Sequence, residues 1–250
     1  MRHPIMAVLA AASVSAAMWG GALSAQAAPA AIAAAVANPA RPDADKARDA
    51  DRKPAEVLAF AGVKSGDKVG ELIPGGGYYT RLLSALVGPT GKVYALVPQG
   101  MLAAKPETEA ALKAIGPNVV VVGFAAPSAP EPLDVVWTSE NYHDFHNSRP
   151  GGPPADIAAF NHAIFAALKP GGVFLVEDHA AAAGAGPGVT STLHRIDPAQ
   201  VESEIEAAGF KLEASSTLLA NATDPHTAAV FDPTIRGHTD KLLLKFRKPK

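Results

Sequence analysis

An acidic residue and three consecutive glycines stand close together in the segment VGELIPGGGYYTRLL, residues 69–83. Glu71 lies near the end of an apolar run that predicts a strand, and the glycines at 75–77 separate this run from a predicted helix. Glycine has no Cβ, so such a turn lets the backbone approach a ligand and adopt positive φ angles. The Glu71 carboxylate could accept hydrogen bonds from a cationic or hydroxyl-bearing ligand. An acid disfavours a phosphate ligand here, and a plain tight turn with a solvated Glu71 is the alternative.

A second group of reactive side chains follows the apolar run LDVVWTS, residues 133–139. The chain continues as ENYHDFH, in which His143 and Asp144 are adjacent. An imidazole with a pKa near neutral can remove a proton from a hydroxyl or amine, and a neighbouring carboxylate can orient it. We expect His143 to act as a general base with Asp144 as its partner. Capping of the loop by Asn141 and Asp144 is an equally good interpretation, because Asn and Asp satisfy turns as readily as substrates.

Other polar residues could converge with His143 at one edge of a sheet: Asp178, His179, His194, Arg195 and Asp197. Imidazole and carboxylate ligands suit Zn²⁺, Ni²⁺ or Fe²⁺. The segment HDFH lacks the i, i+4 spacing of an H-E-x-x-H helix, and no other spacing fixes a ligand set, so we predict no metal site. Asp197 has a simpler role in RIDPAQV, as the N-cap of a helix that begins with proline.

Short runs rich in Val, Ile and Leu alternate with helical stretches, and this alternation must position the reactive side chains. Runs without strict polar alternation are typical of parallel strands buried on both faces and joined by right-handed crossovers. We predict strands at 68–73, 92–97, 118–123, 133–139, 173–178, 211–219 and 241–247, with helices at 78–88, 107–116, 156–172 and 198–210 and one ending near 62. The fold class is therefore α/β, a doubly wound and mostly parallel sheet whose last two strands form an antiparallel hairpin. Trp137 is expected to fill the core.

The composition restricts the partners and the chemistry. The chain has 250 residues, a formal net charge of −2 and no cysteine. The chain therefore has no excess of positive charge that would attract nucleic acid. Disulfides, thiolate zinc sites and cysteine nucleophiles are excluded. No G-x-S-x-G frame is present for a serine hydrolase.

The first 27 residues have the pattern of a secretory signal peptide. A cationic start at Arg2 precedes an apolar stretch at 5–23, and Ala25 and Ala27 give the small-x-small ending before cleavage. We expect a periplasmic or secreted protein with no stable membrane insertion after cleavage. Residues 28–42 are small and apolar with little bulk, and we expect a flexible lead-in there, with the folded domain at 43–250.

The motifs together resemble class I S-adenosylmethionine-dependent methyltransferases over residues 52–247. The resemblance rests on GELIPGGGYYTRLL, GPTGKVYALVP, LDVVWTSENYHDFH and ALKPGGVFLVEDH. More narrowly, PGGGYYT, NYHD, LHRID and FDPTIRGHTDKLLLKFRKP are similar to a group of predicted exported bacterial methyltransferases. The family resemblance implies a Rossmann-like seven-stranded sheet with an antiparallel C-terminal strand and S-adenosylmethionine as cofactor. Carried onto this sequence, it assigns cofactor contacts to Glu71, Pro74, Gly75, Gly76, Gly77, Tyr78, Thr80, Gln99 and Asn141.

The sequence departs from the family pattern at two positions. The first glycine of the acid-x-Gly-x-Gly-x-Gly motif is Ile73, and a β-branched residue does not readily enter positive φ. Strand two of the family ends with an acid for the ribose hydroxyls, and Val97 stands there instead. The valine side chain cannot accept a hydrogen bond, so Gln99, backbone groups or water would have to bind the ribose hydroxyls. Ribose hydroxyls left without a partner would cost about 1–3 kcal/mol.

Two functions are consistent with these residues. The first is methyl transfer from S-adenosylmethionine to a small-molecule acceptor, with catalysis mainly by positioning. The second is a non-catalytic exported module that retains the methyltransferase fold and binds a small ligand or partner, because fold does not determine function. Export and Val97 favour the module, whereas Glu71 and the glycine turn favour the enzyme. The sequence makes no prediction of the acceptor's identity or of the oligomeric state.

Overall fold

The computed structural model describes residues 30–148 and 155–250, so the expected signal peptide at 1–27 lies outside the described residues. Seven strands form one sheet in the order β3-β2-β1-β4-β5-β7-β6. They are β1 Lys68–Leu72, β2 Lys92–Pro98, β3 Val119–Phe124, β4 Leu133–Ser139, β5 Leu168–His179, β6 Lys211–Ser215 and β7 Lys241–Arg247. Strands β1 to β5 pair in parallel, and β7 runs antiparallel to both β5 and β6. The predicted, mostly parallel sheet and its final antiparallel hairpin are confirmed.

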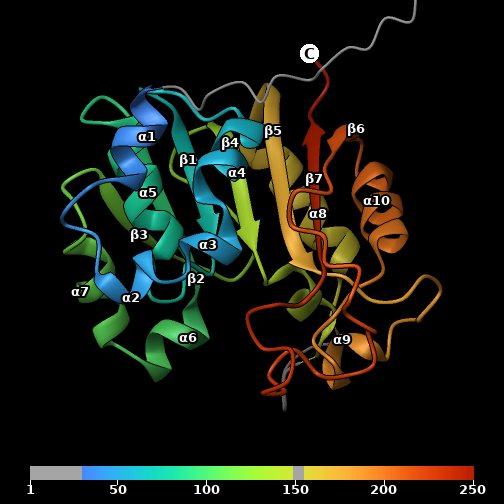
Figure 1. Cartoon of the computed structure of the whole chain (residues 1–250). Coiled ribbons are helices and arrows are strands. Elements are labelled where there is room, and N and C mark those ends of the chain that lie inside the picture. Colours follow the sequence, from blue (N-terminus) through green and yellow to red (C-terminus); the bar gives the residue numbers. More distant parts are fainter. Residues whose placement is uncertain (1–29, 149–154) are drawn as a thin grey trace, which may run out of the picture.

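Helices cover both faces of the sheet, so the domain has three layers (Figure 1). The helices are α1 Ala30–Val36, α2 Asp43–Lys46, α3 Asp49–Arg52, α4 Pro54–Ala61, α5 Tyr78–Val87, α6 Gln99–Ala104, α7 Glu107–Lys113, α8 Ile157–Ala167, α9 Val189–Thr192 and α10 Pro198–Ala207, with a 3₁₀ helix η1 at Tyr142–His146. One apolar cluster joins a sheet face to α1, α4, α5 and α7. The other joins the opposite face to α8 and α10. Trp137 is fully buried in the first cluster, as predicted.

The chain between α8 and β5 differs from its prediction. We expected a helix through residue 172, but α8 ends at Ala167 and β5 begins at Leu168, which pairs with Leu133. Pro170 cannot continue a helix because it has no N–H and its ring clashes with the preceding turn. Gly171 has φ +78, a conformation that glycine adopts without strain. The segment therefore extends the strand.

The flexible lead-in expected at 28–42 is wrong for the part of it that the structure describes. Ile32 and Ala35 of α1 are each only 3% exposed and pack against α4 and α5. Arg41 is also buried, donates to the Val36 carbonyl at 2.6 Å and pairs with Asp49. Two apolar side chains on one turn of α1 pack against α4 and α5, a tertiary contact that local composition does not reveal. The folded domain thus includes Ala30.

The parallel strands β1, β4 and β5 end at the same edge of the sheet, where their arrowheads in Figure 1 point the same way and that of β7 points oppositely. Helix α3 and the long segment between β6 and β7 lie beside this edge (Figure 1). In an open α/β sheet, ligands bind outside the carboxyl ends of the strands. Every helix within the described ranges is too short or too polar to cross a bilayer.

Candidate functional site

The glycine turn connects β1 to α5 through three residues with left-handed backbone. Ile73 has φ +46, Gly75 has φ +56 and Gly77, the N-cap of α5, has φ +84. The φ of Gly77 is one that side chains rarely adopt, and a Cβ there would also displace the end of the Ile115 side chain, so glycine is strongly favoured at this position. Our expectation that Ile73 would avoid positive φ is wrong. Its N–H donates to the Leu96 carbonyl at 2.9 Å and its carbonyl accepts from the Asn141 amide at 3.3 Å, and these bonds offset a backbone cost of order 1 kcal/mol.

Glu71 is buried at the end of β1, with 4% of its surface exposed. Thr80 Oγ1, on the first turn of α5, donates to Glu71 Oε2 at 2.6 Å. Burial raises the pKa of Glu71 to about 7, more than the Thr80 hydrogen bond lowers it. A cationic group placed beside this carboxylate would restore its charge at neutral pH, because opposite charges favour the ionised form.

Most of the predicted cofactor residues line one cavity of about 230 Å³. The residues in its wall that we had assigned to the cofactor are Glu71, Pro74, Gly75, Gly76, Tyr78 and Asn141. Thr80 and Gly77 lie just behind this wall, where they hold Glu71 and begin α5. The Asn141 amide donates to the Ser139 carbonyl at 2.6 Å and to the Ile73 carbonyl at 3.3 Å, and the two bonds together tie the end of β4 to the turn after β1. The structure thus gives Asn141 the loop-fastening contacts that we had left as an alternative.

Helices α2 and α3 supply the opposite wall, which sequence reasoning missed. The Arg52 guanidinium lies 4.9 Å from the Tyr78 ring centroid and forms an ion pair with Glu140. The Tyr78 hydroxyl donates to Asp49 at 2.6 Å. Arg48 lines the same cavity. The only signal of this wall in the sequence is the charged segment DADKARDADR, which reads equally well as a solvated helix face.

Two neighbouring acids at this edge have opposite pKa shifts. Burial opposes ionisation of Glu140, but Arg52 and Lys241 outweigh it and lower its pKa to about 2. Glu177 is fully buried on β5, and burial together with the nearby Glu140 charge raises its pKa. It accepts from the hydroxyls of Ser139 at 2.9 Å and Tyr79 at 3.1 Å. Glu140 therefore carries a charge at neutral pH that Arg52 and Lys241 balance.

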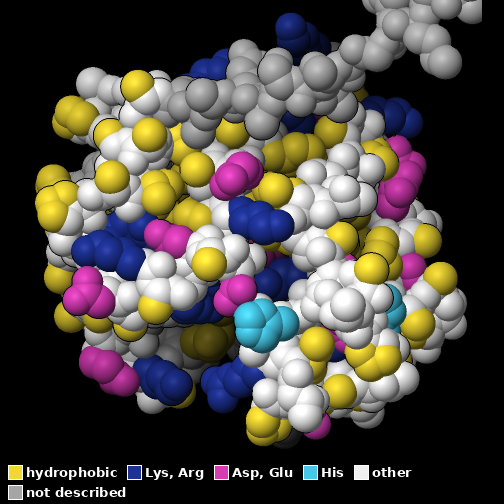
Figure 2. Space-filling model, viewed as in Figure 1, with side chains coloured by type: hydrophobic (Ala, Val, Ile, Leu, Met, Phe, Trp, Pro, Cys, Tyr) yellow, Lys and Arg dark blue, Asp and Glu magenta, His cyan; other side chains and the backbone are white. Residues whose placement is uncertain are grey.

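A second cavity, of about 430 Å³, adjoins the first and shares Arg48, Arg52 and Glu140 with it. His179, Phe231, Arg236 and Lys241 contribute to its wall. In Figure 2, Lys and Arg side chains gather around the central hollow of this face. Burial lowers the pKa of His179 to about 4, so this imidazole is neutral at physiological pH. Basic residues in the wall outnumber acidic ones, which favours an anionic ligand.

Gln99 is separated from the other predicted cofactor residues. It begins α6 directly after β2 and lines a third cavity, of about 380 Å³, together with Phe124, Asp144 and Phe145. Val97, which replaces the family's ribose-binding acid, is buried in the core. Gln99 is the first polar side chain after the end of β2.

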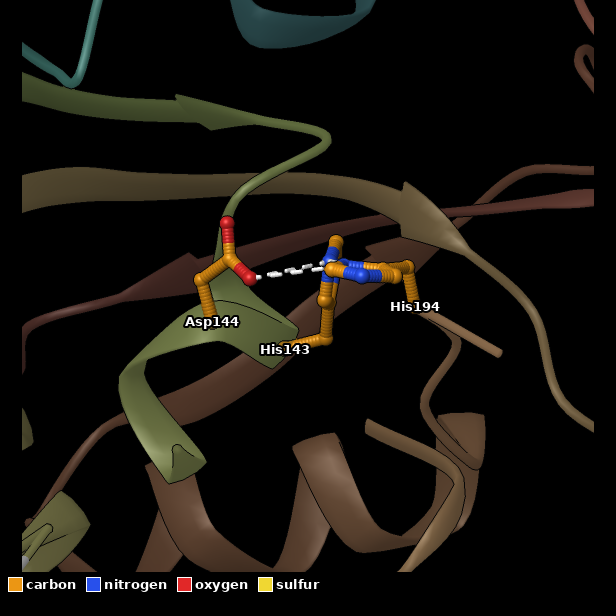
Figure 3. Close-up of side chains that lie close together, drawn as sticks. All are labelled: His143, Asp144 and His194. Atoms are coloured by element: carbon orange, nitrogen blue, oxygen red, sulfur yellow. Dashed lines mark hydrogen bonds and ion pairs between the residues drawn. The ribbon is translucent and has the colours of Figure 1, made fainter. Parts of the chain in front are cut away.

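His143 lies in η1, beside Asp144 and His194 (Figure 3), and the carboxylate that holds it is not the expected Asp144. Its Nδ1 is 2.8 Å from Asp178 Oδ1, and its backbone N–H donates to Asp178 Oδ2 at 2.7 Å. The expected partner, Asp144, lies on the opposite side of the ring, with Oδ1 at 3.3 Å from Nε2. Burial opposes protonation of His143, yet the Asp178 charge outweighs it and raises the imidazole pKa. Asp178, at the end of β5, is therefore the residue that orients His143.

The remaining candidates divide between this cluster and the scaffold. His194 Nδ1 lies 3.3 Å from His143 Nε2, so these two residues do converge. Arg195 instead points into the protein, fully buried, where it forms an ion pair with Asp224. Asp197 is the N-cap of α10 and accepts from the Ala199 N–H at 2.9 Å, as predicted.

The strand order and the single antiparallel strand define the Rossmann-like fold of class I methyltransferases, and solved structures agree. One is an S-adenosylmethionine-dependent methyltransferase from Aquifex aeolicus, with TM-score 0.55 and 19% identity over 82% of this chain and 95% of that one. Another is the complex between the Haloferax volcanii Trm112 methyltransferase activator and a protein named as a methyltransferase. Its TM-score is 0.57, with 20% identity over 88% of this chain and 97% of the matched chain. A third is the [4+2]-cyclase SpnF, with TM-score 0.57 and 18% identity over 80% of this chain and 81% of the SpnF chain.

These likenesses establish the fold. No protein-family model matches the chain, and no curated protein matches it. Because a cyclase shares the fold with a methyltransferase, the reaction has to be argued from the site.

The raised pKa of Glu71 predicts a pH-dependent stability. The folded protein binds a proton at Glu71 more tightly than the unfolded chain, so stability falls as pH rises from about 4.5 to about 7 and is level above that. The Glu71→Gln variant keeps the acceptor for Thr80 but has no charge to bury. Its free energy of unfolding relative to the wild type should therefore increase by about 3 kcal/mol between pH 4.5 and pH 8.

Urea unfolding of both proteins at several pH values measures this difference, in which other titrating groups cancel. A difference that stays constant across the range would mean that folding does not shift the pKa of Glu71.

Proposed function

We propose that the protein is an S-adenosylmethionine-dependent methyltransferase that acts on a small-molecule acceptor. The observation that carries the proposal is the buried Glu71 carboxylate and the glycine turn in the wall of one cavity, at the carboxyl ends of β1 and β4. The methionine ammonium group of the cofactor is a cation that this carboxylate would bind. The exposed backbone at Gly75 and Gly76 leaves room for the rest of the methionine moiety, because no atom lies within 4 Å of a Cβ built at either position.

The nucleoside end of the cofactor is assigned to the third cavity. Leu72 at the end of β1 pairs with Leu96 of β2, so the first and third cavities open at the ends of adjacent strands, about 4.8 Å apart. An extended ligand can run from Glu71 across these ends to Gln99, which is then the ribose contact. The rings of Phe124 and Phe145 supply an apolar surface on which an adenine can stack.

The methyl acceptor is assigned to the second cavity, next to the methionine site. Arg48 and Arg236 lie in its wall and have no ion-pair partner among residues 30–148 and 155–250. An acceptor that carries a carboxylate or another anionic group would pair with them. During transfer the S–CH₃ bond breaks as the bond from the acceptor nucleophile to the methyl carbon forms, and the electron pair of the broken bond stays on sulfur. Holding both partners in line supplies most of the rate enhancement.

Calorimetric titration of residues 28–250 with S-adenosylmethionine and with S-adenosylhomocysteine tests the proposal. We expect micromolar dissociation constants that weaken at least tenfold in Glu71→Gln. The absence of heat at millimolar ligand would overturn the methyltransferase assignment and leave a binding module that retains the fold.

Export is a separate part of the proposal. We propose that residues 1–27 direct secretion, as in the exported bacterial group that the sequence resembles, so that the mature protein is periplasmic or secreted. The first described helix begins at Ala30, three positions after the expected cleavage at Ala27, so cleavage would leave the folded domain intact. N-terminal sequencing of the protein from the periplasmic fraction should give Ala28. An intact N-terminus on that protein would contradict cleavage.

A further inference from the structure

Three ligand atoms from two separate parts of the chain converge beside the second and third cavities (Figure 3). His143 Nε2 lies 3.3 Å from His194 Nδ1 and 3.3 Å from Asp144 Oδ1, and His194 Nδ1 lies 3.6 Å from the same oxygen. We propose that His143, Asp144 and His194 bind a divalent transition-metal ion, with Zn²⁺ as the reference ion.

The spacing of the three atoms matches a tetrahedral metal site. Zinc binds imidazole nitrogen and carboxylate oxygen at about 2.0–2.2 Å, and tetrahedral angles then place neighbouring ligand atoms about 3.3–3.6 Å apart. All three distances fall in this range. A single shared proton can join only two of the three lone-pair atoms, whereas a metal ion accepts electron density from all of them.

The surroundings of His143 are those of a metal-bound histidine. A ligating imidazole commonly donates its other ring N–H to a carboxylate, which fixes the tautomer and orients the ring. Asp178, fully buried, accepts from Nδ1 at 2.8 Å and from the backbone N–H of the same residue at 2.7 Å. With Nδ1 as the donor, the Nε2 lone pair faces Asp144 and His194, so Asp178 acts as a positioning residue for the ligand.

The backbone at His194 gives an independent observation. Its φ is +54, an uncommon value for a residue with a side chain. This conformation turns the imidazole toward His143, with the two rings nearly perpendicular and their centroids 5.4 Å apart. Strained backbone of this kind is found mainly at functional sites.

The site is open on the side of the proposed acceptor. The side chains of Asp144 and His194 are 45% and 32% exposed, so a metal held by three protein ligands keeps at least one position for water or substrate. Phe231, whose ring centroid lies 4.9 Å from that of His194, lines the second cavity.

If the proposed methyl transfer holds, an acceptor hydroxyl bound to the metal loses its proton to solvent more easily, and the resulting alkoxide attacks the methyl carbon. His143 is then a ligand, in place of the general base that we expected from the sequence.

Metal titration of residues 28–250 without S-adenosylmethionine tests the site. We expect one equivalent of Zn²⁺ by equilibrium dialysis, and Co²⁺ should bind in competition with Zn²⁺ and give the visible absorption of a four-coordinate site. Asp144→Asn and His194→Ala should weaken Zn²⁺ about 100-fold or more, and Asp178→Asn about 10–100-fold. Asp144 is half-exposed, so its variant should keep the wild-type circular dichroism and Tm.

Two histidine variants serve as controls. His162 is exposed on α8, and His226 pairs with a carboxylate away from this cluster, at 2.9 Å from Asp240. His162→Ala and His226→Ala should keep full Zn²⁺ affinity. Unchanged affinity in folded Asp144→Asn and His194→Ala, or no stoichiometric Zn²⁺ in the wild type, overturns the metal site. Because this titration omits the cofactor, and the cofactor titration can be run with a chelator, each proposal can fail without the other.

Discussion

The Gly76→Leu variant is expected to lose S-adenosylmethionine binding while it keeps its fold. Gly76 is exposed in the wall of the first cavity, no atom lies within 4 Å of a Cβ built there, and its φ is outside the left-handed range. A leucine therefore enters the cavity without backbone strain and takes a substantial part of about 230 Å³. We expect the dissociation constant to rise at least 100-fold, or about 2.7 kcal/mol, with a stability change within about 0.5 kcal/mol.

Gly188→Leu is the matched control. Gly188 is also exposed, has open space around its Cβ position and has an ordinary φ of −65°, but it lies at the start of α9, outside the first cavity. Calorimetry with S-adenosylmethionine compares the two variants, and thermal unfolding reports their folds. Wild-type affinity in a folded Gly76→Leu protein would move the cofactor out of this cavity.

The largest loss of stability is expected from Arg195→Met. Arg195 and Asp224 are both fully buried in their side chains and form a two-pronged ion pair, at 2.8 and 3.1 Å. Arg195 also donates to the carbonyls of Ala180 and Ala228 at 2.9 and 3.0 Å. Methionine fills much of the volume but leaves a buried carboxylate without its cation. Such a change costs about 3–5 kcal/mol, or a fall in Tm of roughly 6–20 °C for a domain of this size.

Arg247→Met is the control that replaces an arginine whose ion pair is partly exposed rather than buried. Arg247 pairs with Glu213 on the partly exposed edge between β7 and β6, where an ion pair contributes about 0–1 kcal/mol. Thermal and urea unfolding of both variants should show the large loss only for Arg195→Met. A loss below about 1 kcal/mol there would mean that the segment between β6 and β7 does not depend on this pair.

The same ion pair illustrates the limit of sequence reasoning. Arg195 follows His194 directly, and both were candidates for the edge that carries His143. The positive φ of His194 turns one side chain toward His143 and leaves the next pointing into the protein, toward Asp224. Asp224 is 29 residues further along the chain, and no local pattern connects the two. Which neighbour reaches the site is decided by backbone angles that packing imposes.

The N-terminal segment shows the same limit. The charged residues 43–52 form α2 and α3, and tertiary contacts place Arg48 and Arg52 in the wall of the cavity that contains Glu71. A solvated helix and a cavity wall have the same local charge pattern. The apolar face of α1 cannot be recognised from its own sequence either, since its two buried residues pack against the distant helices α4 and α5.

The sequence by itself determined the order of the seven strands and of the main helices between them, the final hairpin, the buried Trp137 and the N-cap at Asp197. Each depends on hydrophobic periodicity or on contacts within a few residues, which the chain specifies locally. Only the tertiary structure decided that Asp178 holds His143, that His194 joins Asp144 on its other side, and that Ile73 takes a left-handed conformation. These arrangements depend on side chains from separate strands and loops meeting at one edge of the sheet, where contacts distant in sequence outweigh local preference.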